Sequence, residues 1–468
     1  AGALVERGLT GRTVGTLLLN EPDTLVTYLG LARAGGVNVP VNVRLSSREQ
    51  EYVLTDAGAS CLVVDREYLA QVRELRARLP EVRDVVVCGA GQDELEDEVA
   101  FGTLLRGDRP DERDLPRCED GSPATITYTA GTTGFPKGVV RTHGANLWNV
   151  ANSALGSPRS TDDVEVFTLP IFGIGFLHFA MAAFIGGATV VLDRAFDASR
   201  CWQLIAAHRP TRIFLAPTMV DLMLRRPSDE RCDVSSLEVI YSAYEFPKRL
   251  RDEALAFFGD KFVYMYGLTE AQLVCGRLGS FAANPTCVGG PMGPMRVRVV
   301  GDDGRPLPAG EVGEIVMDGP ALMSGYHRLP DATAESLRDG WLHTGDLGYL
   351  DDENELHFTG RRKELIKTGG FSVDPREVEN VLLDLPGVRE AAVIGTPDDR
   401  WGEMVVAFVA TEEGSDLDEA QLDQHCRTAL ADFKVPKTVS VVDELPKNPT
   451  GKVERGRLRT LAAGRDAR

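Results

Sequence analysis

The 468-residue sequence lacks the charge and cysteine patterns of several functional classes. Acidic residues outnumber basic ones, 70 against 51, and the formal net charge is -19. Nucleic acids and anionic membranes attract proteins with positive surfaces, so this composition predicts neither as a partner. The eight cysteines form no CxxC pair and no tight cluster. This spacing argues against a zinc site or a disulfide framework and favours a reducing, cytoplasmic environment.

Long uncharged runs are also scarce. One segment, residues 166–192, carries no formal charge over a length that could span a bilayer. Pro170 and several glycines interrupt it, which predicts strand, loop, helix and strand of a buried core rather than a membrane span. The sequence shows no signal peptide and does not begin with methionine, so we leave open whether its N-terminus is trimmed.

Short β-branched runs alternate with helical stretches over the first 285 residues. The pattern predicts helices at 197–208 and 247–258, and strands at 61–65, 85–89, 188–193, 212–217 and 237–243. Such alternation is typical of layered α/β structure with largely parallel sheets. After residue 285 a strand, turn, strand pattern around Asp303 and Gly304 predicts a smaller β-rich subdomain, which extends to about residue 362.

The last hundred residues have a pattern of their own. The charged run "RRKELIK" (361–367) precedes a new series of elements. We expect helices at 375–384 and 417–430, and strands at 389–395, 404–410 and 438–442. We therefore predict an N-terminal domain over residues 1–362 and a separate C-terminal α+β domain over residues 363–468.

The stretch "YTAGTTGFPKGVV" (128–140) is rich in glycine and threonine. Glycines let backbone amides approach a ligand closely, and hydroxyls and a lysine add donors and charge, so the stretch could hold phosphate. It is not a Walker loop, because Pro136 rather than glycine precedes the lysine. An ordinary turn fits the composition equally well. The candidate phosphate ligands are Thr129, Gly131, Thr132, Thr133, Gly134 and Lys137.

Three other segments carry candidate ligands. "YGLTE" (266–270) follows an apolar run and offers an aromatic face, a hydroxyl and a carboxylate, which could stack on a base and hold Mg²⁺. Asp346 ends "WLHTGD" and could bind ribose hydroxyls. Lys452 lies in the turn-rich "PKNPTGKVER" (446–455). Taken singly, each is matched by a plainer alternative: a solvent-facing carboxylate, a turn aspartate and a solvated lysine.

Together and in this order, these segments resemble the adenylate-forming superfamily of acyl-CoA synthetases, aryl-CoA ligases, luciferases and peptide-synthetase adenylation domains. The similarity covers nearly the whole chain and includes "GEVGEIVMDGPALMSGYH", "DGWLHTGDLGYL" and "GRRKELIKTGGFSVDPREVE". The resemblance implies two half-reactions. A carboxylate attacks the α-phosphate of MgATP, giving an acyl-adenylate and pyrophosphate, and a thiol then takes the acyl group and releases AMP.

The resemblance also implies roles for individual residues. The glycine-rich loop would hold the β- and γ-phosphates, Tyr266 would stack on adenine, and Asp346 and Arg361 would bind the ribose. Thr269 would contact the α-phosphate, Glu270 would bind Mg²⁺, and Lys452 would place positive charge between carboxylate and α-phosphate. There the negative transition state needs positioning and electrostatic stabilisation rather than a protein nucleophile. In keeping with this, the sequence has no G-x-S-x-G elbow.

A domain rotation is the third implication of the resemblance. Lys363 matches the hinge position of the family. Rotation about it would remove Lys452 and bring a thiol tunnel to the same site, so that one site serves both half-reactions. The plainer alternative is a charged linker. The tunnel residues would be Lys367, Gly369, Gly370 and Phe371.

Several departures from the family pattern concern the acid. Gly173 stands where histidine is common, "SAYE" (242–245) replaces the usual small residues, and Met265 replaces a glycine, whereas Gly267 remains small. The segment 170–176 has no aspartate to hold an amino group, so amino acids are disfavoured. We expect a medium, branched or aromatic carboxylic acid, with long-chain fatty acids less favoured. The expected pocket residues are Phe172, Gly173, Tyr244, Glu245, Met265 and Gly267.

The leading hypothesis is a cytoplasmic carboxylic acid-CoA ligase that uses ATP, Mg²⁺ and coenzyme A, without nucleic-acid or membrane partners. The nearest alternative is a stand-alone enzyme that loads the acyl group onto the pantetheine of a carrier protein. A third is a non-catalytic nucleotide or acyl binder. The presence of Glu270, Asp346, Arg361 and Lys452 argues against this last alternative.

Overall fold

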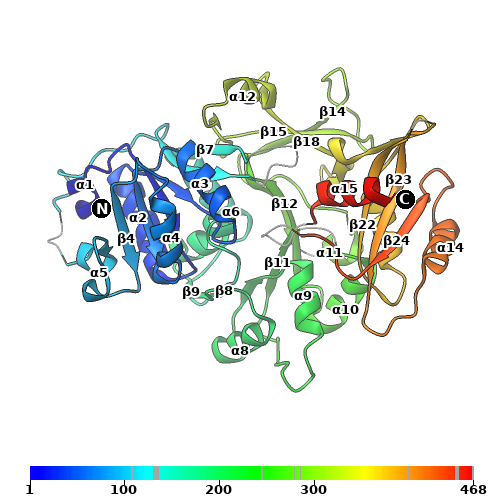
Figure 1. Ribbon diagram of the computed structural model, residues 1–468, viewed down its shortest axis with the longest axis horizontal. Helices are drawn as coiled ribbons and strands as arrows, with labels where there is room; N and C mark the ends of the chain where they lie inside the picture. Colours follow the sequence, from blue (N-terminus) through cyan, green and yellow to red (C-terminus); the bar gives the residue numbers. More distant parts are fainter. Residues whose placement is uncertain are drawn as a thin grey trace.

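The computed structural model describes residues 1–106, 110–129, 136–173, 175–243, 246–278, 280–284, 286–398, 400–447 and 453–465. Its strands form four sheets with helices packed on them. In Figure 1 the N-terminal sheet lies on the left, a second sheet occupies the centre, a β-rich part lies at the top and the C-terminal part lies on the right. This architecture confirms the predicted α/β fold class.

The first sheet has the strand order β16-β7-β6-β2-β1-β3-β4-β5. Strands β1 to β6 pair in parallel, whereas β7 is antiparallel to both β6 and β16. The central strands are continuous apolar runs because they are buried on both faces. The strands are β1 (Thr13–Leu17), β2 (Val37–Pro40), β3 (Cys61–Asp65), β4 (Asp84–Cys88), β5 (Val99–Ala100), β6 (Pro123–Tyr128), β7 (Gly138–Thr142) and β16 (Gly325–Tyr326).

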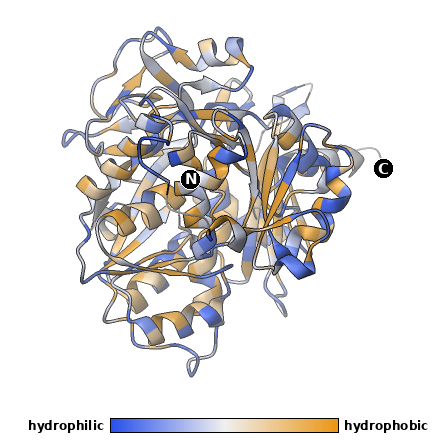
Figure 2. Ribbon diagram, turned by 90° about the vertical axis from the view of Figure 1, so that its left-hand side faces the viewer, coloured by the Kyte–Doolittle hydropathy of each residue, from blue (hydrophilic) through white to orange (hydrophobic). Residues whose placement is uncertain are grey.

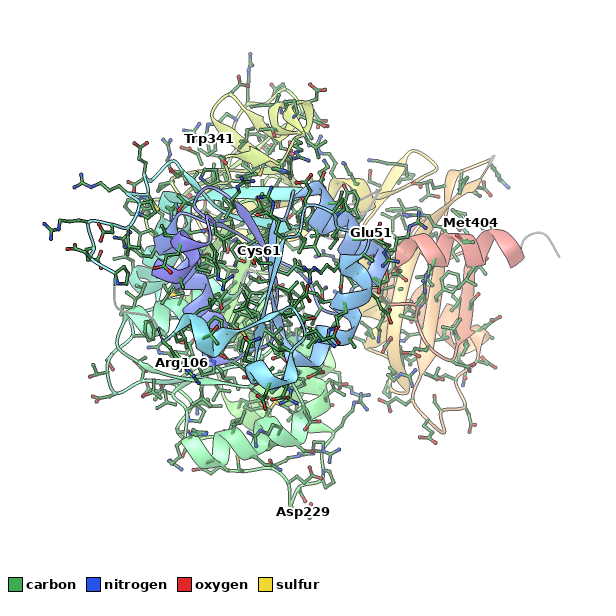
Figure 3. All side chains as sticks on the ribbon, turned by 60° about the vertical axis from the view of Figure 1, so that its left-hand side comes forward. Glu51, Cys61, Arg106, Asp229, Trp341 and Met404 are labelled. Atoms are coloured by element: carbon green, nitrogen blue, oxygen red, sulfur yellow. The ribbon has the colours of Figure 1, made fainter. Side chains whose placement is uncertain are left out.

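Five helices among the described residues alternate in sequence with the strands of the first sheet. They are α1 (Gly2–Glu6), α2 (Pro22–Ala34), α3 (Ser47–Asp56), α4 (Leu69–Arg76) and α5 (Phe101–Leu104). Helix α3 begins with a capping box, in which Ser46 accepts from the Glu49 amide and Glu49 accepts from the Ser46 amide. Figure 3 shows Cys61, the first residue of β3, deep among the central strands.

The second sheet has the order β13-β12-β11-β10-β8-β9, and only the β12–β13 pair among them is antiparallel. Its strands are β8 (Val164–Phe167), β9 (Thr189–Leu192), β10 (Arg212–Phe214), β11 (Val239–Ala243), β12 (Phe262–Leu268) and β13 (Gln272–Leu278). Its helices are α6 (His143–Gly156), α8 (Ala198–His208), α9 (Pro217–Leu224), α10 (Lys248–Phe258) and α11 (Ser280–Ala283). The predicted parallel layering is therefore confirmed.

The uncharged segment 166–192 is divided as expected. It contains the end of β8, a π-helix η3 (Phe176–Met181) that continues into α7 (Ala182–Ile185), and β9. The π-helix was not predicted, because apolar periodicity does not distinguish i→i+5 from i→i+4 hydrogen bonds. Within the described ranges, no helix is both long and apolar enough to cross a membrane.

The β-rich part has the order β14-β15-β18-β17, and β19 pairs with β18. The Asp303–Gly304 turn forms, with Gly304 at a φ of +76° and the Arg305 amide donating to Asp303. It sits inside a connection longer than a two-residue hairpin, between antiparallel β14 and β15. The elements are β14 (Arg296–Val300), β15 (Gly313–Asp318), α12 (Pro330–Ser336), β17 (Leu337–Arg338), β18 (Trp341–Leu350) and β19 (Leu356–Arg361).

The C-terminal sheet has the order β21-β20-β23-β22, with β24 paired to β23. All five predicted elements are present with ends within a few residues of those expected. Its strands are β20 (Ile366–Thr368), β21 (Phe371–Val373), β22 (Val388–Asp398), β23 (Gly402–Thr411) and β24 (Thr438–Val442), and its helices are α13 (Pro375–Leu383), α14 (Glu419–Ala429) and α15 (Arg455–Arg465). The sheet has its own apolar cores, with Val393 and Ala407 on one face and Phe408 on the other.

Hydrophobic segments follow the strands inside the layers, and polar segments gather at the loops and outer helix faces (Figure 2). Between the body and the C-terminal part, Glu412 forms ion pairs with Arg249 of α10 at 3.1 Å and with Arg225, which follows α9, at 3.5 Å. Arg376 of α13 also reaches across and lies over the Phe358 ring of β19, 4.6 Å from its centroid. Polar and cation–π contacts thus join the two parts.

Candidate active site

A buried carboxylate forms the centre of the first group of predicted ligands. Asp346 of β18 and Arg361 at the end of β19 are paired across the antiparallel strands. Arg361 Nε forms an ion pair with Asp346 Oδ1 at 3.0 Å, and the hydroxyl of Tyr266 on β12 donates to Asp346 Oδ2 at 2.7 Å. Three predicted nucleotide ligands from two sheets are therefore in direct contact.

Burial is the largest influence on the pKa values of Asp346 and Tyr266. Asp346 is only 3% exposed, and burial raises the pKa of its carboxyl, although Arg361 and Tyr266 favour the ionised form. Burial and the nearby Asp346 raise the pKa of Tyr266 well above its usual range. Tyr266 thus remains a neutral hydrogen-bond donor, and Asp346 provides an acceptor whose ionisation depends on pH.

The ring of Tyr266 is also packed against an aromatic neighbour. It stacks on Phe358 with the ring centroids 5.4 Å apart, and Phe358 in turn carries the Arg376 guanidinium. Arg376 belongs to the C-terminal helix α13. The Phe358 ring therefore contacts both Tyr266 and a side chain of the C-terminal part. The stacking of adenine on Tyr266 itself stays a prediction.

A second group joins two segments that are far apart in the sequence. Tyr326 of β16 donates its hydroxyl hydrogen to Glu270 Oε1 at 2.7 Å. Lys137 Nζ lies over the Tyr326 ring, 4.8 Å from the centroid. Pairing of β16 with β7 brings this about, because it sets Tyr326 opposite Val139, two residues after the lysine. The predicted Mg²⁺ ligand and a predicted phosphate ligand thus share one neighbour.

The ends of the glycine-rich stretch lie close together. The Thr129 amide donates to the Lys137 carbonyl at 3.0 Å, immediately beyond the antiparallel β6–β7 pair. The described ends of the stretch therefore lie on the antiparallel β6–β7 pair of the first sheet. The predicted ligands Gly131, Thr132, Thr133 and Gly134 lie outside the described residues.

The expected acid pocket adjoins a buried amide network. Gln272, which begins β13 and has a φ of +63°, accepts from Asn149 Nδ2 at 3.3 Å. Asn149 Oδ1 is 3.3 Å from His178 Nδ1. The network comes from α6, η3 and β13, and sequence reasoning missed it because buried amides have no distinctive spacing.

Four of the six expected pocket residues are described. Met265 is buried in the core of the second sheet, whereas Phe172 is half-buried and Gly173 is exposed. A Cβ on Gly267 would approach the Gln272 carbonyl oxygen far inside van der Waals contact. The β12–β13 bulge therefore excludes any side chain at residue 267. Tyr244 and Glu245 lie outside the described residues.

The residues expected to line a thiol tunnel make their contacts within the C-terminal part. The Gly369 amide donates to the Trp401 carbonyl at 2.7 Å, and the Phe371 ring stacks on Phe433 at 4.6 Å. Lys367 Nζ donates to the Ser372 hydroxyl. Phe371 is nevertheless 55% exposed, and Gly370 adopts a φ of +85° in the β20–β21 turn. These residues are thus gathered on one exposed turn, apart from Asp346 and Glu270.

The predicted hinge residue Lys363 lies in the short 3-10 turn η4 (Arg362–Glu364), between β19 and β20. Lys363 lies two residues after Arg361, the ribose ligand expected from the sequence. Lys452 lies outside the described residues. The hinge, the tunnel and the lysine assignments therefore stay predictions.

Two family models match the chain. The model of the AMP-binding enzyme covers residues 1–327, and the model of the AMP-binding enzyme C-terminal domain covers residues 377–452. The chain belongs to the AMP-binding enzyme family. The resemblance to adenylate-forming enzymes inferred from the six sequence segments is therefore confirmed.

Curated and solved relatives of this AMP-binding enzyme match over nearly its whole length. It is 37% identical to an indoleacetate–CoA ligase of Aromatoleum aromaticum, over 99% of this chain and 91% of the relative. It is 36% identical to the fatty acid–[acyl-carrier-protein] ligase ScoC of Streptomyces coeruleorubidus, over 100% of this chain and 90% of that relative. The crystal structure of ATP-bound MatB from Rhodopseudomonas palustris superposes with a TM-score of 0.88 at 30% identity, covering 98% of this chain and 90% of that chain.

Sequence reasoning missed Tyr326, which contacts two of the predicted ligands in this AMP-binding enzyme. The segment "GYH" was part of the resemblance, but nothing in its spacing links it to Glu270. The Tyr326 hydroxyl and the Met323 amide, which donates to the Glu270 carbonyl, join the segment to Glu270, and the pairing of β16 with β7 brings it to Val139. Arg376 was also missed, since its contact with Phe358 joins helix α13 to strand β19, and nothing in the sequence links the two.

The donor chemistry of the site fits Mg²⁺. Among the described residues, no three His, Cys, Asp or Glu side chains gather into a metal-binding group. Mg²⁺ is commonly held by one or two carboxylates together with substrate phosphates, so the Glu270 carboxylate, which shares the neighbour Tyr326 with the predicted phosphate ligand Lys137, suits it. The hydrogen bond from Tyr326 leaves Glu270 further oxygen lone pairs for an ion.

Proposed function

We propose that this protein is an ATP-dependent carboxylic acid–CoA ligase that forms an acyl-adenylate and pyrophosphate, then an acyl-CoA thioester and AMP. The observation that carries the proposal is the contact of Tyr266, Asp346 and Arg361 in a chain of the AMP-binding enzyme family. The indoleacetate–CoA ligase relative supports the reaction class.

In the first half-reaction, the Asp346 carboxylate accepts hydrogen bonds from the ribose hydroxyls, and Arg361 keeps that carboxylate oriented. Glu270 supplies an oxygen ligand to Mg²⁺, which would neutralise phosphate charge when bound. Lys137 and the glycine-rich stretch hold the β- and γ-phosphates. Lys452 would supply positive charge between the acid and the α-phosphate, where negative charge accumulates in the transition state.

In the second half-reaction, the C-terminal part turns about Lys363. The exposed β20–β21 turn then approaches the site, with Gly369, Gly370 and Phe371 beside the incoming thiol. This placement is supported by the exposure of the turn and by the polar contacts of Glu412 and Arg376, which are of the kind that can break and re-form.

The proposed substrate is a medium, branched or aromatic carboxylic acid. Buried Met265 would narrow the pocket, whereas Gly267 adds no side chain to it. All eight cysteines are free, which supports the proposed reducing cytoplasm. A carrier-protein thiol as acceptor is the second candidate, because the relative ScoC is a fatty acid–[acyl-carrier-protein] ligase.

Exchange of labelled pyrophosphate into ATP tests the adenylation step. We expect exchange that depends on an added acid, followed by thioester formation when CoA is supplied. Exchange with thioester formed only on a carrier protein would favour the second candidate. Absence of acid-dependent exchange across aliphatic and aromatic acids would contradict the proposal.

A further inference from the structure

A small internal cavity lies between the first sheet and the helices that cover it. Its volume is about 40 Å³, and its walls come from β1, β2, β6, β7, α2 and η3. Gly173 and Gln272 also line it, and both belong to the region of the expected acid pocket. This volume can hold one or two water molecules or a single carboxylate-sized group.

Arg141 of β7 lines this cavity and is fully buried, at 0% exposure. Its Nε donates to Asn146 Oδ1 at 2.9 Å, and its Nη2 donates to the Ala145 carbonyl at 3.1 Å. Its Nη1 has no hydrogen-bond partner. In the described part of the chain, no carboxylate forms an ion pair with Arg141. A buried guanidinium without a counter-charge is costly, so an anion at this place would be strongly favoured.

The other polar groups around the cavity show what kind of ligand is missing. Thr16 donates to Asn38 Oδ1 at 2.9 Å, so those two groups satisfy each other. The Tyr28 hydroxyl accepts from Asn146 Nδ2 at 3.2 Å, and no acceptor for its own hydrogen is found among the described residues. Arg141 Nη1 and the Tyr28 hydroxyl are therefore two unused donors. Two donors facing a small space match a group that only accepts, such as a carboxylate.

Gly173 connects this cavity with the expected position of the acid. It lacks a side chain where histidine is common in the family, so nothing from this residue separates the acid pocket from the cavity. Gln272 forms another part of the boundary and is held by Asn149. An acid lying beside Gly173 can thus extend a second group toward Arg141.

The geometry points to a doubly acidic substrate: Arg141 and Tyr28 bind a second anionic group of the carboxylic acid, remote from the carboxylate that is adenylated. The inference rests on the proposed ligase function and narrows its substrate class. The second group stays unreacted, because it is held in the cavity by hydrogen bonds to the Arg141 guanidinium and the Tyr28 hydroxyl. Arg141 is then a specificity-determining residue.

Matched acids test the inference. Pyrophosphate release is measured with butyrate and succinate, hexanoate and adipate, and benzoate and terephthalate. In the unaltered protein, at least one diacid should exceed its monoacid partner by about tenfold or more in kcat/KM, as expected for a charge-assisted hydrogen bond. Arg141→Met should lower that diacid value by about 10- to 100-fold and change the monoacid value far less.

Two further variants keep the test decisive. Arg12→Met removes an exposed arginine of the same domain and should leave the diacid preference unchanged. Tyr28→Phe preserves the ring, removes one of the two donors and should lower the diacid preference severalfold, which covers the case that Arg141→Met does not fold. Thermal unfolding of each variant shows which of them are folded.

The outcomes separate the two claims. Pyrophosphate release with monoacids but no diacid preference, or equal losses for both acids in Arg141→Met, would overturn the inference and leave the ligase function intact. Such a result would mean that water alone occupies the cavity. If no acid supports release, the ligase function fails, and calorimetry decides the anion site: diacid binding that is lost in Arg141→Met supports it, and no binding overturns it.

Discussion

The Tyr326 hydroxyl donates a 2.7 Å hydrogen bond to Glu270, and the same ring lies beneath Lys137 Nζ. One side chain thereby fixes the spacing between a predicted Mg²⁺ ligand and a predicted phosphate ligand. Burial and the nearby Glu270 raise the pKa of Tyr326 above its usual value, so its hydroxyl stays protonated and can donate at neutral pH. We infer that Tyr326 positions both groups for the same triphosphate.

Tyr326→Phe should weaken the Mg²⁺ dependence of catalysis while leaving the Lys137 contact in place, because only the hydroxyl is removed. Loss of one hydrogen bond to a carboxylate corresponds to about 1.5–3 kcal/mol, so the half-saturating Mg²⁺ concentration should rise roughly tenfold or more. Pyrophosphate release against Mg²⁺ concentration at fixed ATP measures this. Tyr349→Phe, whose ring stacks on His357, is the matched control. Identical dependence of pyrophosphate release on Mg²⁺ concentration in the two variants would contradict the positioning role of Tyr326.

Tyr266→Phe should shift the acid limb of the pH profile. The hydrogen bond from Tyr266 favours the ionised form of Asp346, so its loss raises the pKa of Asp346 further. A carboxyl with a raised pKa loses its charge sooner as the pH falls, and ATP binding by the carboxylate is lost with it. The acid limb of kcat/KM for ATP should therefore move to higher pH. An unchanged acid limb would show that Asp346 does not control ATP binding.

Gly369→Leu should slow acyl transfer to the thiol and spare adenylation. Gly369 has a φ of +58°, and a Cβ there would lie 3.0 Å from the Trp401 ring. Transfer should fall by at least about tenfold, equivalent to ~1.4 kcal/mol in the barrier. Single-turnover transfer from preformed acyl-adenylate measures it.

Gly414→Leu controls for backbone strain in that experiment. Gly414 lies in the same domain with a φ of +80°, and a Cβ there meets open space. Both variants should lose about 1 kcal/mol of stability through the left-handed conformation. If both slow transfer equally, the effect comes from destabilisation, and the placement of Gly369 beside the thiol is wrong.

Glu412→Gln should change the balance between the two half-reactions. Glu412 pairs with Arg249 and Arg225 across the domain boundary, and removing its charge weakens the contact that holds this arrangement. The pairs are partly exposed, so the ratio of the two half-reaction rates should change by no more than about threefold and the change should fade in high salt. Glu413→Gln removes the same charge from the neighbouring exposed residue. Equal effects of both changes, or none, would exclude a role for the Glu412 pairs.

The strands could be predicted best where both sheet faces are buried. The run at 61–65 coincides with the fully buried β3, because a continuous apolar run has few alternative structures. The run at 438–442 coincides with β24, although that strand is only partly buried. Other strands end earlier than expected because the next element begins there. The strand expected at 212–217 ends at Phe214, since Pro217 begins α9. The local sequence pattern therefore predicted which elements form. The residues at which they end depended on where the next element begins.

The candidate site could be predicted residue by residue but not as an arrangement. Asp346 and Arg361 are 15 positions apart, and their contact follows from the β18–β19 register, which the sequence does not specify. The Tyr326–Glu270 bond depends on a two-residue strand, β16, too short to give a periodic signal. Arg141 was missed because an arginine in a strand ordinarily indicates an exposed position, whereas here helix α6 and its Asn146 cover it.

We expect this single enzyme to cleave ATP into AMP and pyrophosphate in order to activate a carboxylic acid. The most direct measurement is the stoichiometry of all products in one reaction that contains ATP, Mg²⁺, an accepted acid and CoA. We expect AMP, pyrophosphate and acyl-CoA in equal amounts, with none formed when the acid is omitted. Formation of ADP and phosphate, or AMP release that does not depend on the acid, would contradict it.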